Sequence, residues 1–178
     1  MARIQTIEKQ RTNDAVRPIY EEIEETFGWV PNIFKTYAHF PPLLKTNWEK
    51  VKAVMMAGSL RRELKEAIAL VVSDANACQY CIVAHGLALQ QLGFGRESID
   101  ALAKNLKESG FQPKDQKILE VARKATKDAN SVTDQDIAEL RLAGWSESEI
   151  VEAQGVMELF TGFNKFLDSL AVDIDFQK

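Results

Sequence analysis

Apolar residues recur along most of the chain at the three- and four-residue spacing that is typical of an amphipathic helix. In the first such segment these positions are Val16, Ile19, Ile23 and Phe27. The pattern predicts a helix over residues 14–27, because Gly28 follows as a stop signal and Pro18 falls in the first turn, where proline is tolerated. No segment shows the strict alternation of a β-strand. We therefore predict an all-α helical bundle.

Proline, glycine and capping residues divide the rest of the chain into further predicted helices. These are a turn and a short helix over 29–34, a helix from Pro41-Pro42 to Gly58, one over 60–74 capped by Ser59, one from an Asn76 cap to Leu92, a short one around 99–102 and one from Pro113. Two more helices are predicted after Thr133 and Ser146, because each of these residues stands three positions before an acidic residue, as in a capping box.

A weak internal duplication becomes visible when the chain is slid along itself by 51 residues. The segment 89–94 then lies over 140–145, and both contain a glycine followed by an aromatic residue. At the same offset Glu66, Cys78, Cys81 and His85 align with Lys117, Ala129, Val132 and Asp136. The apolar positions are therefore shared by the two copies, whereas the reactive groups belong to the first copy alone.

Length and composition limit the classes of protein to which the chain can belong. Its 178 residues, 46% of them apolar, suffice for one sizeable core, so we expect a single domain over 1–178. The net charge of −4 argues against a nucleic-acid partner. The longest apolar run, 67–72, is too short to span a membrane, and residues 1–11 lack the apolar core of a signal peptide. We expect a cytoplasmic protein.

The chemistry of the chain is concentrated in one short stretch, where Glu66, Cys78, Cys81 and His85 have the spacing Glu-x11-Cys-x2-Cys-x3-His. This stretch holds both cysteines and one of the two histidines. At about 100° per residue in a helix, the two cysteines and the histidine fall on one narrow stripe. Glu66 belongs to the preceding predicted helix, so its carboxylate reaches this stripe only if the two helices pack side by side.

These residue types in this spacing point to thiol redox chemistry. A cysteine reacts as its thiolate, and the first turn of a helix favours negative charge on sulfur. His85, one turn after Cys81, can accept a proton from that thiol. A sulfenate formed on one cysteine by peroxide can be resolved by the other cysteine to a disulfide.

Two other interpretations of the cysteine pair stay open at this point. The thiols can be half of a zinc site, although a fourth ligand would have to be a carboxylate or the remote His39. They can also be inert packing residues. We expect neither a metal nor a cofactor, and we interpret His39 as a turn or interface residue. The aromatic residues Trp29, Phe34, Tyr37, Phe40 and Trp48 are expected either to wall an apolar substrate channel or to pack in the core or an interface.

The four-residue signature, with the apolar helix before it and Leu89-x-x-Leu92-Gly93 after it, resembles the carboxymuconolactone decarboxylase and AhpD-like alkylhydroperoxidase family. The likeness spans about residues 60–102. The segments 31–34, 41–42 and 164–165 add a similarity to the peroxidase-related branch.

That resemblance implies an all-helical, cofactor-free peroxidase that assembles as a trimer or hexamer, reduces a hydroperoxide and is recycled by a thiol reductant. It implies that Cys81 attacks the peroxide, that Cys78 resolves the sulfenate, and that Glu66 and His85 form a proton relay. The family enzyme has a further histidine at the position that is Tyr80 here. A phenol with a pKa near ~10 is a poor general base at neutral pH, so Tyr80 puts the full relay in doubt.

Three rival functions follow from the same residues. The pair can serve a general thiol–disulfide oxidoreductase or redox sensor without efficient peroxide turnover. The scaffold can carry a lyase of the carboxymuconolactone decarboxylase type, although fold likeness alone does not transfer that reaction. The chain can also be a non-enzymatic helical oligomer. The presence of both thiols is our reason for preferring peroxide reduction.

Overall fold

The computed structural model describes residues 2–176, and those residues form helices and no β-strand. The main helices are α1 (Arg17–Phe27), α2 (Asn32–Tyr37), α3 (Pro41–Val51), α4 (Arg62–Ala75), α5 (Gln79–Gln91), α6 (Arg96–Lys104), α7 (Pro113–Lys127), α8 (Asp134–Leu142) and α9 (Glu147–Leu170). Short helical turns are η1 (Lys9–Arg11), η2 (Lys52–Met56), η3 (Leu106–Glu108) and η4 (Ala129–Ser131). The predicted all-α fold is confirmed.

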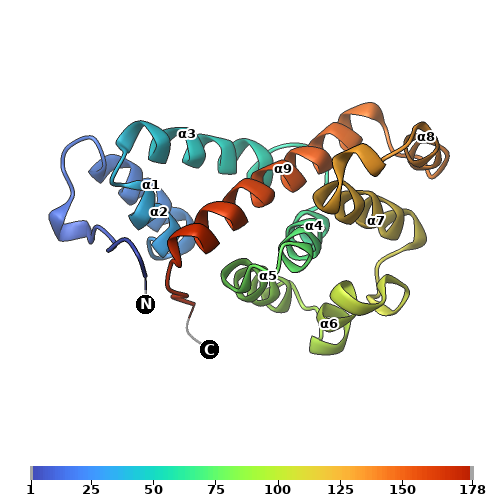
Figure 1. Ribbon diagram of the computed structural model, residues 1–178, viewed down its shortest axis with the longest axis horizontal. Helices are drawn as coiled ribbons and strands as arrows, with labels where there is room; N and C mark the ends of the chain where they lie inside the picture. The colour runs from blue at the N-terminus through green and yellow to red at the C-terminus, as the bar shows by residue number, and fades with distance from the viewer. Residues whose placement is uncertain (1, 177–178) are drawn as a thin grey trace.

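The long helix α9 crosses most of the molecule, with α1, α2 and α3 toward one end and α7 and α8 toward the other (Figure 1). Helix α4 packs against α5, α7 and α9 and is the centre of the core. Its apolar residues from Leu64 to Val72 are buried, because the stretch 67–72 is apolar on every face. The site helix α5 lies beside α4, so the side-by-side packing that the sequence left as an assumption is present.

Most of the predicted helix ends are confirmed. Helix α1 carries Pro18 in its first turn and ends at Gly28, whose φ of 84° is left-handed. The capping boxes that start at Thr133 and Ser146 are both formed. The predicted cap at Ser59 is wrong: α4 begins at Arg62, because the Ser59 N–H donates instead to a carboxylate oxygen of Glu152 at 2.9 Å.

The predicted straight helix from Pro41-Pro42 to Gly58 is also interrupted. Helix α3 ends at Val51 and widens into the π-helical turn η2. Lys65, of which only 1% is exposed, donates to the carbonyl oxygens of Val54, at 2.9 Å, and Ala57, and pairs with Glu152 at 2.6 Å. This buried ammonium therefore ties η2 to both α4 and α9.

The internal duplication is visible in the helices themselves. The offset of 51 residues places α4 on α7, α5 on α8 and α6 on the start of α9. Gly93 and Gly144 end the second helix of each copy with φ of 91° and 90°. The residue after each glycine donates its N–H to an equivalent leucine carbonyl, Phe94 to Leu89 at 3.0 Å and Trp145 to Leu140 at 3.1 Å.

Candidate functional site

The two helices that carry the predicted site meet at Cys78, which belongs to both helix ends. The N–H of Cys78 donates to the Ser73 carbonyl and the N–H of Ala77 to the Asp74 carbonyl, each at 2.9 Å, and these bonds close the last turn of α4. Ala77 has a left-handed φ of 59°, and Cys78 is then the N-cap of α5. The predicted N-cap, Asn76, is wrong. Asn76 instead ends α4, because the left-handed turn at Ala77 delays the start of α5.

The two cysteines occupy the N-cap and the third position of α5. Ser146 and Glu149 occupy the same two positions of α9, where their side chains lie 2.7 Å apart, and the capping box of α8 is alike. Side chains at these positions point toward each other across the open end of the helix. Cys78 and Cys81 are both free and buried in this arrangement, which is suited to a reversible disulfide.

A buried carboxylate lies between two cationic groups next to the cysteines. Oε2 of Glu66 lies 2.6 Å from Nδ1 of His85, and Oε1 lies 2.7 Å from a guanidinium nitrogen of Arg62. Burial raises the pKa of Glu66, but the hydrogen bond from His85 and the charges of His85 and Arg62 outweigh it and lower the pKa overall. The carboxylate therefore stays ionised and holds the proton of the imidazole on Nδ1, which leaves Nε2 for other partners.

The ionisation of the two thiols is coupled. The pKa of Cys78 is lowered, chiefly because the thiol and the backbone N–H of Cys81 stabilise its thiolate. The pKa of Cys81 is raised by Cys78 and then by burial. One negative charge on the pair opposes the second, so the two sulfurs hold a single negative charge between them.

A cavity of about 880 Å³ opens beside this group. Cys81, His85, Glu66 and Arg62 all line it, while Cys78 does not. The rest of the wall is largely apolar and aromatic, with contributions from Phe27, Trp29, Phe34, Met55, Phe160 and Phe163. Polar groups thus meet an apolar chamber at the Cys81 end, as in a site for a small organic molecule.

The aromatic residues divide between the two roles that the sequence left open. Trp29 and Phe34 wall the cavity, which fits the channel interpretation. Tyr37 and Trp48 are buried in the core, and Phe40 is 61% exposed. The same residue type therefore serves both purposes, and spacing along the chain does not separate them.

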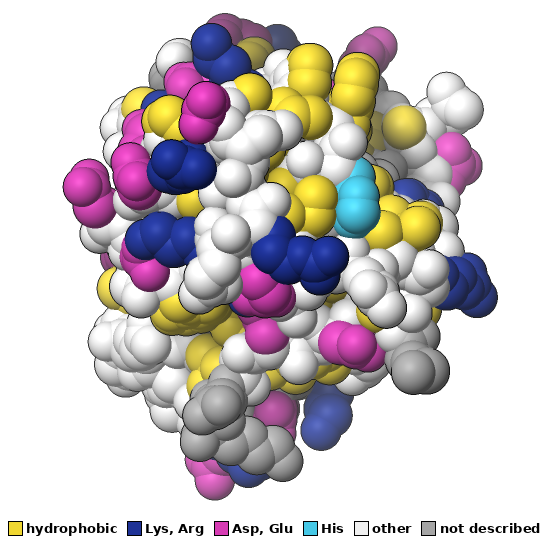
Figure 2. All heavy atoms as spheres, turned by 90° about the vertical axis from the view of Figure 1, so that its left-hand side faces the viewer, with side chains coloured by type: hydrophobic (Ala, Val, Ile, Leu, Met, Phe, Trp, Pro, Cys, Tyr) yellow, Lys and Arg dark blue, Asp and Glu magenta, His cyan; other side chains and the backbone are white. Residues whose placement is uncertain are grey.

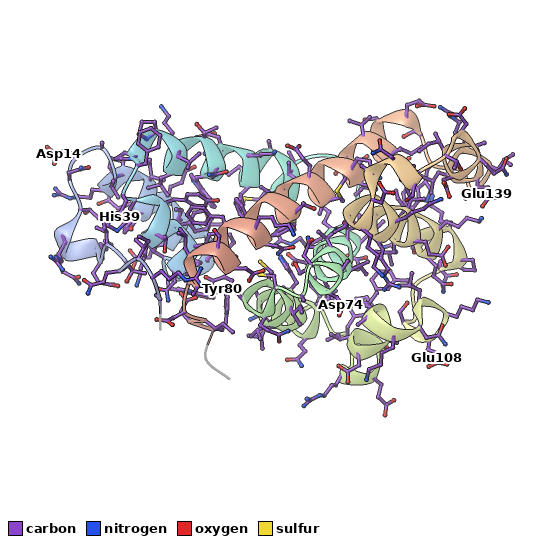
Figure 3. The ribbon with its side chains drawn as sticks, in the orientation of Figure 1. Asp14, His39, Asp74, Tyr80, Glu108 and Glu139 are labelled. Atoms are coloured by element: carbon purple, nitrogen blue, oxygen red, sulfur yellow. The ribbon has the colours of Figure 1, made fainter. Side chains whose placement is uncertain are left out.

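Tyr80 lines the cavity and lies near the C-terminal end of α9 (Figure 3). Its contacts are made with α2 and with the segment after α9. Its hydroxyl oxygen accepts a hydrogen bond from the N–H of Ile33 at 3.4 Å, and its ring packs edge-on against Phe176 at 5.1 Å. Burial and the nearby carboxylate of Asp175 raise its pKa. Tyr80 is therefore a neutral anchor for the C-terminal segment, and that segment supplies part of the cavity wall.

The C-terminal segment after α9 is held by a second contact. The carboxylate of Asp175 accepts a hydrogen bond from the N–H of Asn32 at 2.7 Å, and the Asn32 side chain donates to the Asp173 carbonyl at 3.0 Å. Phe176 lies against Trp29 as well as Tyr80. Residues separated by about the length of the chain thus form one side of the cavity.

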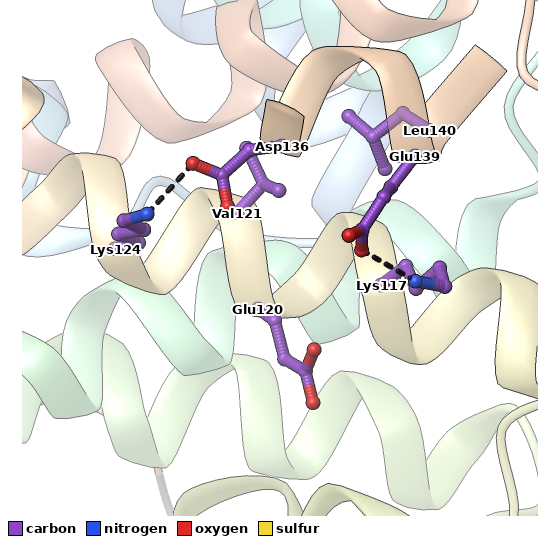
Figure 4. A pocket seen from close by; sticks show the side chains of 7 residues that line it. All are labelled: Lys117, Glu120, Val121, Lys124, Asp136, Glu139 and Leu140. Carbon is purple, nitrogen blue, oxygen red and sulfur yellow. Dashed lines mark hydrogen bonds and ion pairs between the residues drawn. The ribbon is translucent and has the colours of Figure 1, made fainter. Parts of the chain in front are cut away.

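A smaller depression lies in the second copy of the duplication, between α7 and α8 (Figure 4). Two ion pairs fill it, Lys117 with Glu139 at 2.8 Å and Lys124 with Asp136 at 2.7 Å. Lys117 and Asp136 stand where the first copy has Glu66 and His85, and all four groups are partly exposed and paired with the opposite charge. The second copy therefore keeps the helix pair without the thiol chemistry.

Basic and acidic side chains are interspersed on the face in Figure 2, with apolar patches between them. His39 is exposed, and its Nε2 lies 2.8 Å from the Gln5 carbonyl, as fits a turn residue. Among residues 2–176, no three His, Cys, Asp or Glu side chains are grouped to hold a metal ion, and no helix is long and apolar enough to cross a membrane.

Comparison with known proteins shows what the segment that carries this site is similar to. Residues 41–124, which include the carboxylate, both thiols and the imidazole, match the model of the Carboxymuconolactone decarboxylase family. Over 98% of its length the chain also superposes on a peroxidase-related protein from Silicibacter sp. TM1040, with 26% identity, a TM-score of 0.88 and 92% of that chain covered. The chain is thus similar to AhpD-like proteins of the carboxymuconolactone decarboxylase family. An alkylhydroperoxidase AhpD core protein from Ralstonia eutropha JMP134 gives the same values.

Two further relatives of this AhpD-like protein show how diverse the scaffold is. An alkyl hydroperoxide reductase of Mycobacterium tuberculosis is 28% identical over 90 residues, which are 51% of this chain but only 26% of that protein. A debrominase in complex with 2,3,4-tribromopyrrole has the same fold, with a TM-score of 0.84 over 97% of this chain and 91% of its own, at 17% identity.

Sequence reasoning missed several residues of this AhpD-like site. Arg62 is not among the predicted site residues, although its position four residues before Glu66 is the spacing of an ion pair within a helix. Ser73 and Asn164 are fully buried beside the thiols and are joined by a hydrogen bond of 3.1 Å. No signal in the sequence connects them, because they lie 91 residues apart.

Proposed function

We propose that the chain is a thiol-dependent reductase of organic hydroperoxides. Cys81 is the thiol that attacks, Cys78 is the thiol that resolves, and Glu66 with His85 moves the protons. The observation that carries the proposal is the shared cavity: Cys81, His85 and Glu66 line one largely apolar chamber, whereas Cys78 is buried and does not line it. A hydroperoxide in that chamber meets a sulfur and an imidazole together.

The peroxide step requires a proton to leave the thiol and reach the departing oxygen. Nε2 of His85 takes the proton of Cys81, and the carboxylate of Glu66 stabilises the imidazolium through Nδ1 at 2.6 Å. The thiolate then attacks the terminal oxygen of the hydroperoxide, so an S–O bond forms as the O–O bond breaks. The imidazolium returns its proton to the leaving alkoxide, and the products are an alcohol and the sulfenic acid of Cys81.

The disulfide step restores a neutral product. The thiolate of Cys78 attacks the sulfur of the Cys81 sulfenic acid, an S–S bond forms, and the hydroxide that leaves takes a proton to become water. The pKa of Cys78 is lowered, which favours its thiolate. An external thiol reductant returns two electrons by exchange with this disulfide.

Mass spectrometry after one equivalent of cumene hydroperoxide tests the proposal. Reduced wild-type protein should lose two hydrogens, Cys78→Ser should gain one oxygen, and Cys81→Ser should stay reduced. Cumyl alcohol should appear in equal amount. An unmodified wild-type protein, or oxidation of Cys81→Ser at the wild-type rate, would contradict the assignment.

A general thiol–disulfide oxidoreductase is the second candidate. It is favoured by Tyr80, whose hydroxyl is engaged with Ile33 and is thereby kept out of proton transfer. In that case oxidised glutathione should oxidise the dithiol rapidly, while the hydroperoxide should act no faster than it does on a free thiol. Parallel stopped-flow measurements with both oxidants separate the two candidates.

Other features of the proposed enzyme stay predictions. These are its trimeric or hexameric assembly, its cytoplasmic location, the single domain over 1–178 and the identity of the thiol reductant. Sedimentation of the purified protein at several concentrations checks the assembly.

A further inference from the structure

The cysteine pair by itself does not decide which sulfur is the nucleophile. Ionisation of one thiol opposes ionisation of the other, so the pair carries one negative charge that either sulfur can hold. The choice must come from groups outside the pair. Those groups differ on the two sides of the pair, and the difference lies in polar residues of α4 and α9.

A buried network of hydrogen-bonded polar side chains connects α4 to α9 next to the thiols. The Asn76 side chain donates to Oδ1 of Asn164 at 3.0 Å, and Nδ2 of Asn164 donates to Oγ of Ser73 at 3.1 Å. Asn164 and Ser73 are both 0% exposed. The carbonyl of Ser73 also accepts a hydrogen bond from the N–H of Cys78 at 2.9 Å, so the network is attached directly to the turn that carries Cys78.

A count of the hydrogen-bond donors shows which of them this network leaves unused. The oxygen of the Asn164 amide is taken by Asn76, and one of its two N–H groups is taken by Ser73. One amide hydrogen and the hydroxyl hydrogen of Ser73 are left for another acceptor. Buried donors are normally satisfied, and the neighbouring group that both side chains stabilise as an anion is the sulfur of Cys81.

We propose that Ser73 and Asn164 form a two-donor site for the sulfur of Cys81 and thereby select Cys81 as the nucleophile. The inference rests on the proposed function and assigns two positioning residues to it. On the other side of the pair, the carboxylate of Asp168 on α9 opposes a thiolate on Cys78. Of the polar side chains outside the pair, Ser73 and Asn164 therefore favour a thiolate on Cys81, whereas Asp168 opposes one on Cys78.

The other titratable groups near the sulfurs do not compete. Tyr37 on α2 and Tyr80 on α5 both have raised pKa values, chiefly because of burial, and stay neutral. On the cavity side, Glu66 is neutralised by its partners Arg62 and His85. The donors of α4 and α9 are therefore the groups to vary.

A single-thiol background makes the test direct. In Cys78→Ser the thiolate of Cys81 is titrated by its ultraviolet absorbance, alone and combined with Ser73→Ala, Asn164→Ala or Asn164→Asp. Loss of one hydrogen bond to an ion should lower the thiolate fraction at a given pH about tenfold. Asn164→Asp keeps the shape of the side chain but adds a charge, so it should lower the fraction further than Asn164→Ala.

The order of the two Asn164 variants separates the proposal from a merely structural role. A structural role predicts that the isosteric Asp is the milder change, whereas a donor role predicts the reverse. Thr161→Val is the matched control, because this hydroxyl of α9 donates to the sulfur of Met157 at 3.6 Å instead, and it should leave the titration unchanged. Ser73→Ala removes a single hydroxyl, so it tests the two-donor site even if the Asn164 variants fold poorly.

The outcomes are distinguishable from failure of the proposed function. An unchanged titration in both Ser73→Ala and Asn164→Asp overturns the two-donor site, even if the wild-type protein reduces peroxide. The expected order of titrations supports the site, even if the wild-type protein does not react with peroxide and the proposed function fails.

Discussion

Replacing Glu66 by Gln should slow the peroxide step about 5- to 30-fold. The substitution keeps the shape of the side chain but turns a charge-assisted hydrogen bond to His85 into a neutral one. The first kind is worth about 1.5–3 kcal/mol and the second about 0.5–1.5 kcal/mol, so the imidazolium loses about 1–2 kcal/mol. Since about 1.4 kcal/mol is a tenfold change in rate, the expected range follows.

The assay is single-turnover oxidation of the reduced protein by cumene hydroperoxide, followed by the loss of titratable thiols. Glu63→Gln is the matched control, because Glu63 lies three residues earlier on α4 and pairs with Arg61 at 2.9 Å, away from the cavity. The control should react like the wild type. If Glu66→Gln folds normally and is oxidised at the wild-type rate, the carboxylate has no part in the proton relay.

The same substitution should change the acid stability of the protein. The pKa of Glu66 is lowered in the folded state from a usual value of about 4.5, so the ionised group stabilises the fold above that pH. This contribution is lost as the pH falls through the folded pKa. Urea unfolding should therefore show a gap between the wild type and Glu66→Gln that is largest near neutral pH and narrows in acid. A gap that is independent of pH would contradict the depressed pKa.

Three further predictions concern the frame around the site. Ala77→Gly should raise the free energy of unfolding by up to about 1 kcal/mol, because glycine adopts a left-handed φ without strain, and a loss in urea unfolding would argue against that strain. Lys65→Met should cost about 3 kcal/mol in the same measurement, since it leaves Glu152 without its buried partner, and a neutral result would mean that the pair is replaceable. Phe176→Ala should raise the KM for cumene hydroperoxide several-fold while leaving the rate with hydrogen peroxide unchanged. Equal effects on both substrates would mean that Phe176 does not contact the organic group.

Local rules predicted the helices well, because most of their ends depend on nearby residues. Pro18, Gly28 and the two capping boxes act within one or two turns, and each was predicted where the structure has it. The ends that failed depend on distant partners. Helix α3 is followed by η2, in which the carbonyl of Val54 accepts a hydrogen bond from Lys65. Helix α4 starts later than predicted because the N–H of Ser59 donates to Glu152, more than ninety residues away.

The candidate site divides in the same way. The spacing of Glu66, Cys78, Cys81 and His85 indicated the chemistry, and the packing of α4 on α5 brings the carboxylate and imidazole together. The spacing could not show that α9 contributes Asn164, since contacts between distant segments follow from tertiary packing. Nor could it show what replaces the expected histidine, since the hydroxyl of Tyr80 finds its partner 47 residues earlier in the chain.

The position of Cys78 between α4 and α5 has a consequence for homologous sequences. Since the N–H of Cys78 closes the last turn of α4 and Cys78 is also the N-cap of α5, an inserted residue would turn α5 by about 100° against α4. His85 would then face away from Glu66. The interval of 19 positions between these two should therefore resist insertion and deletion in homologues that keep the chemistry.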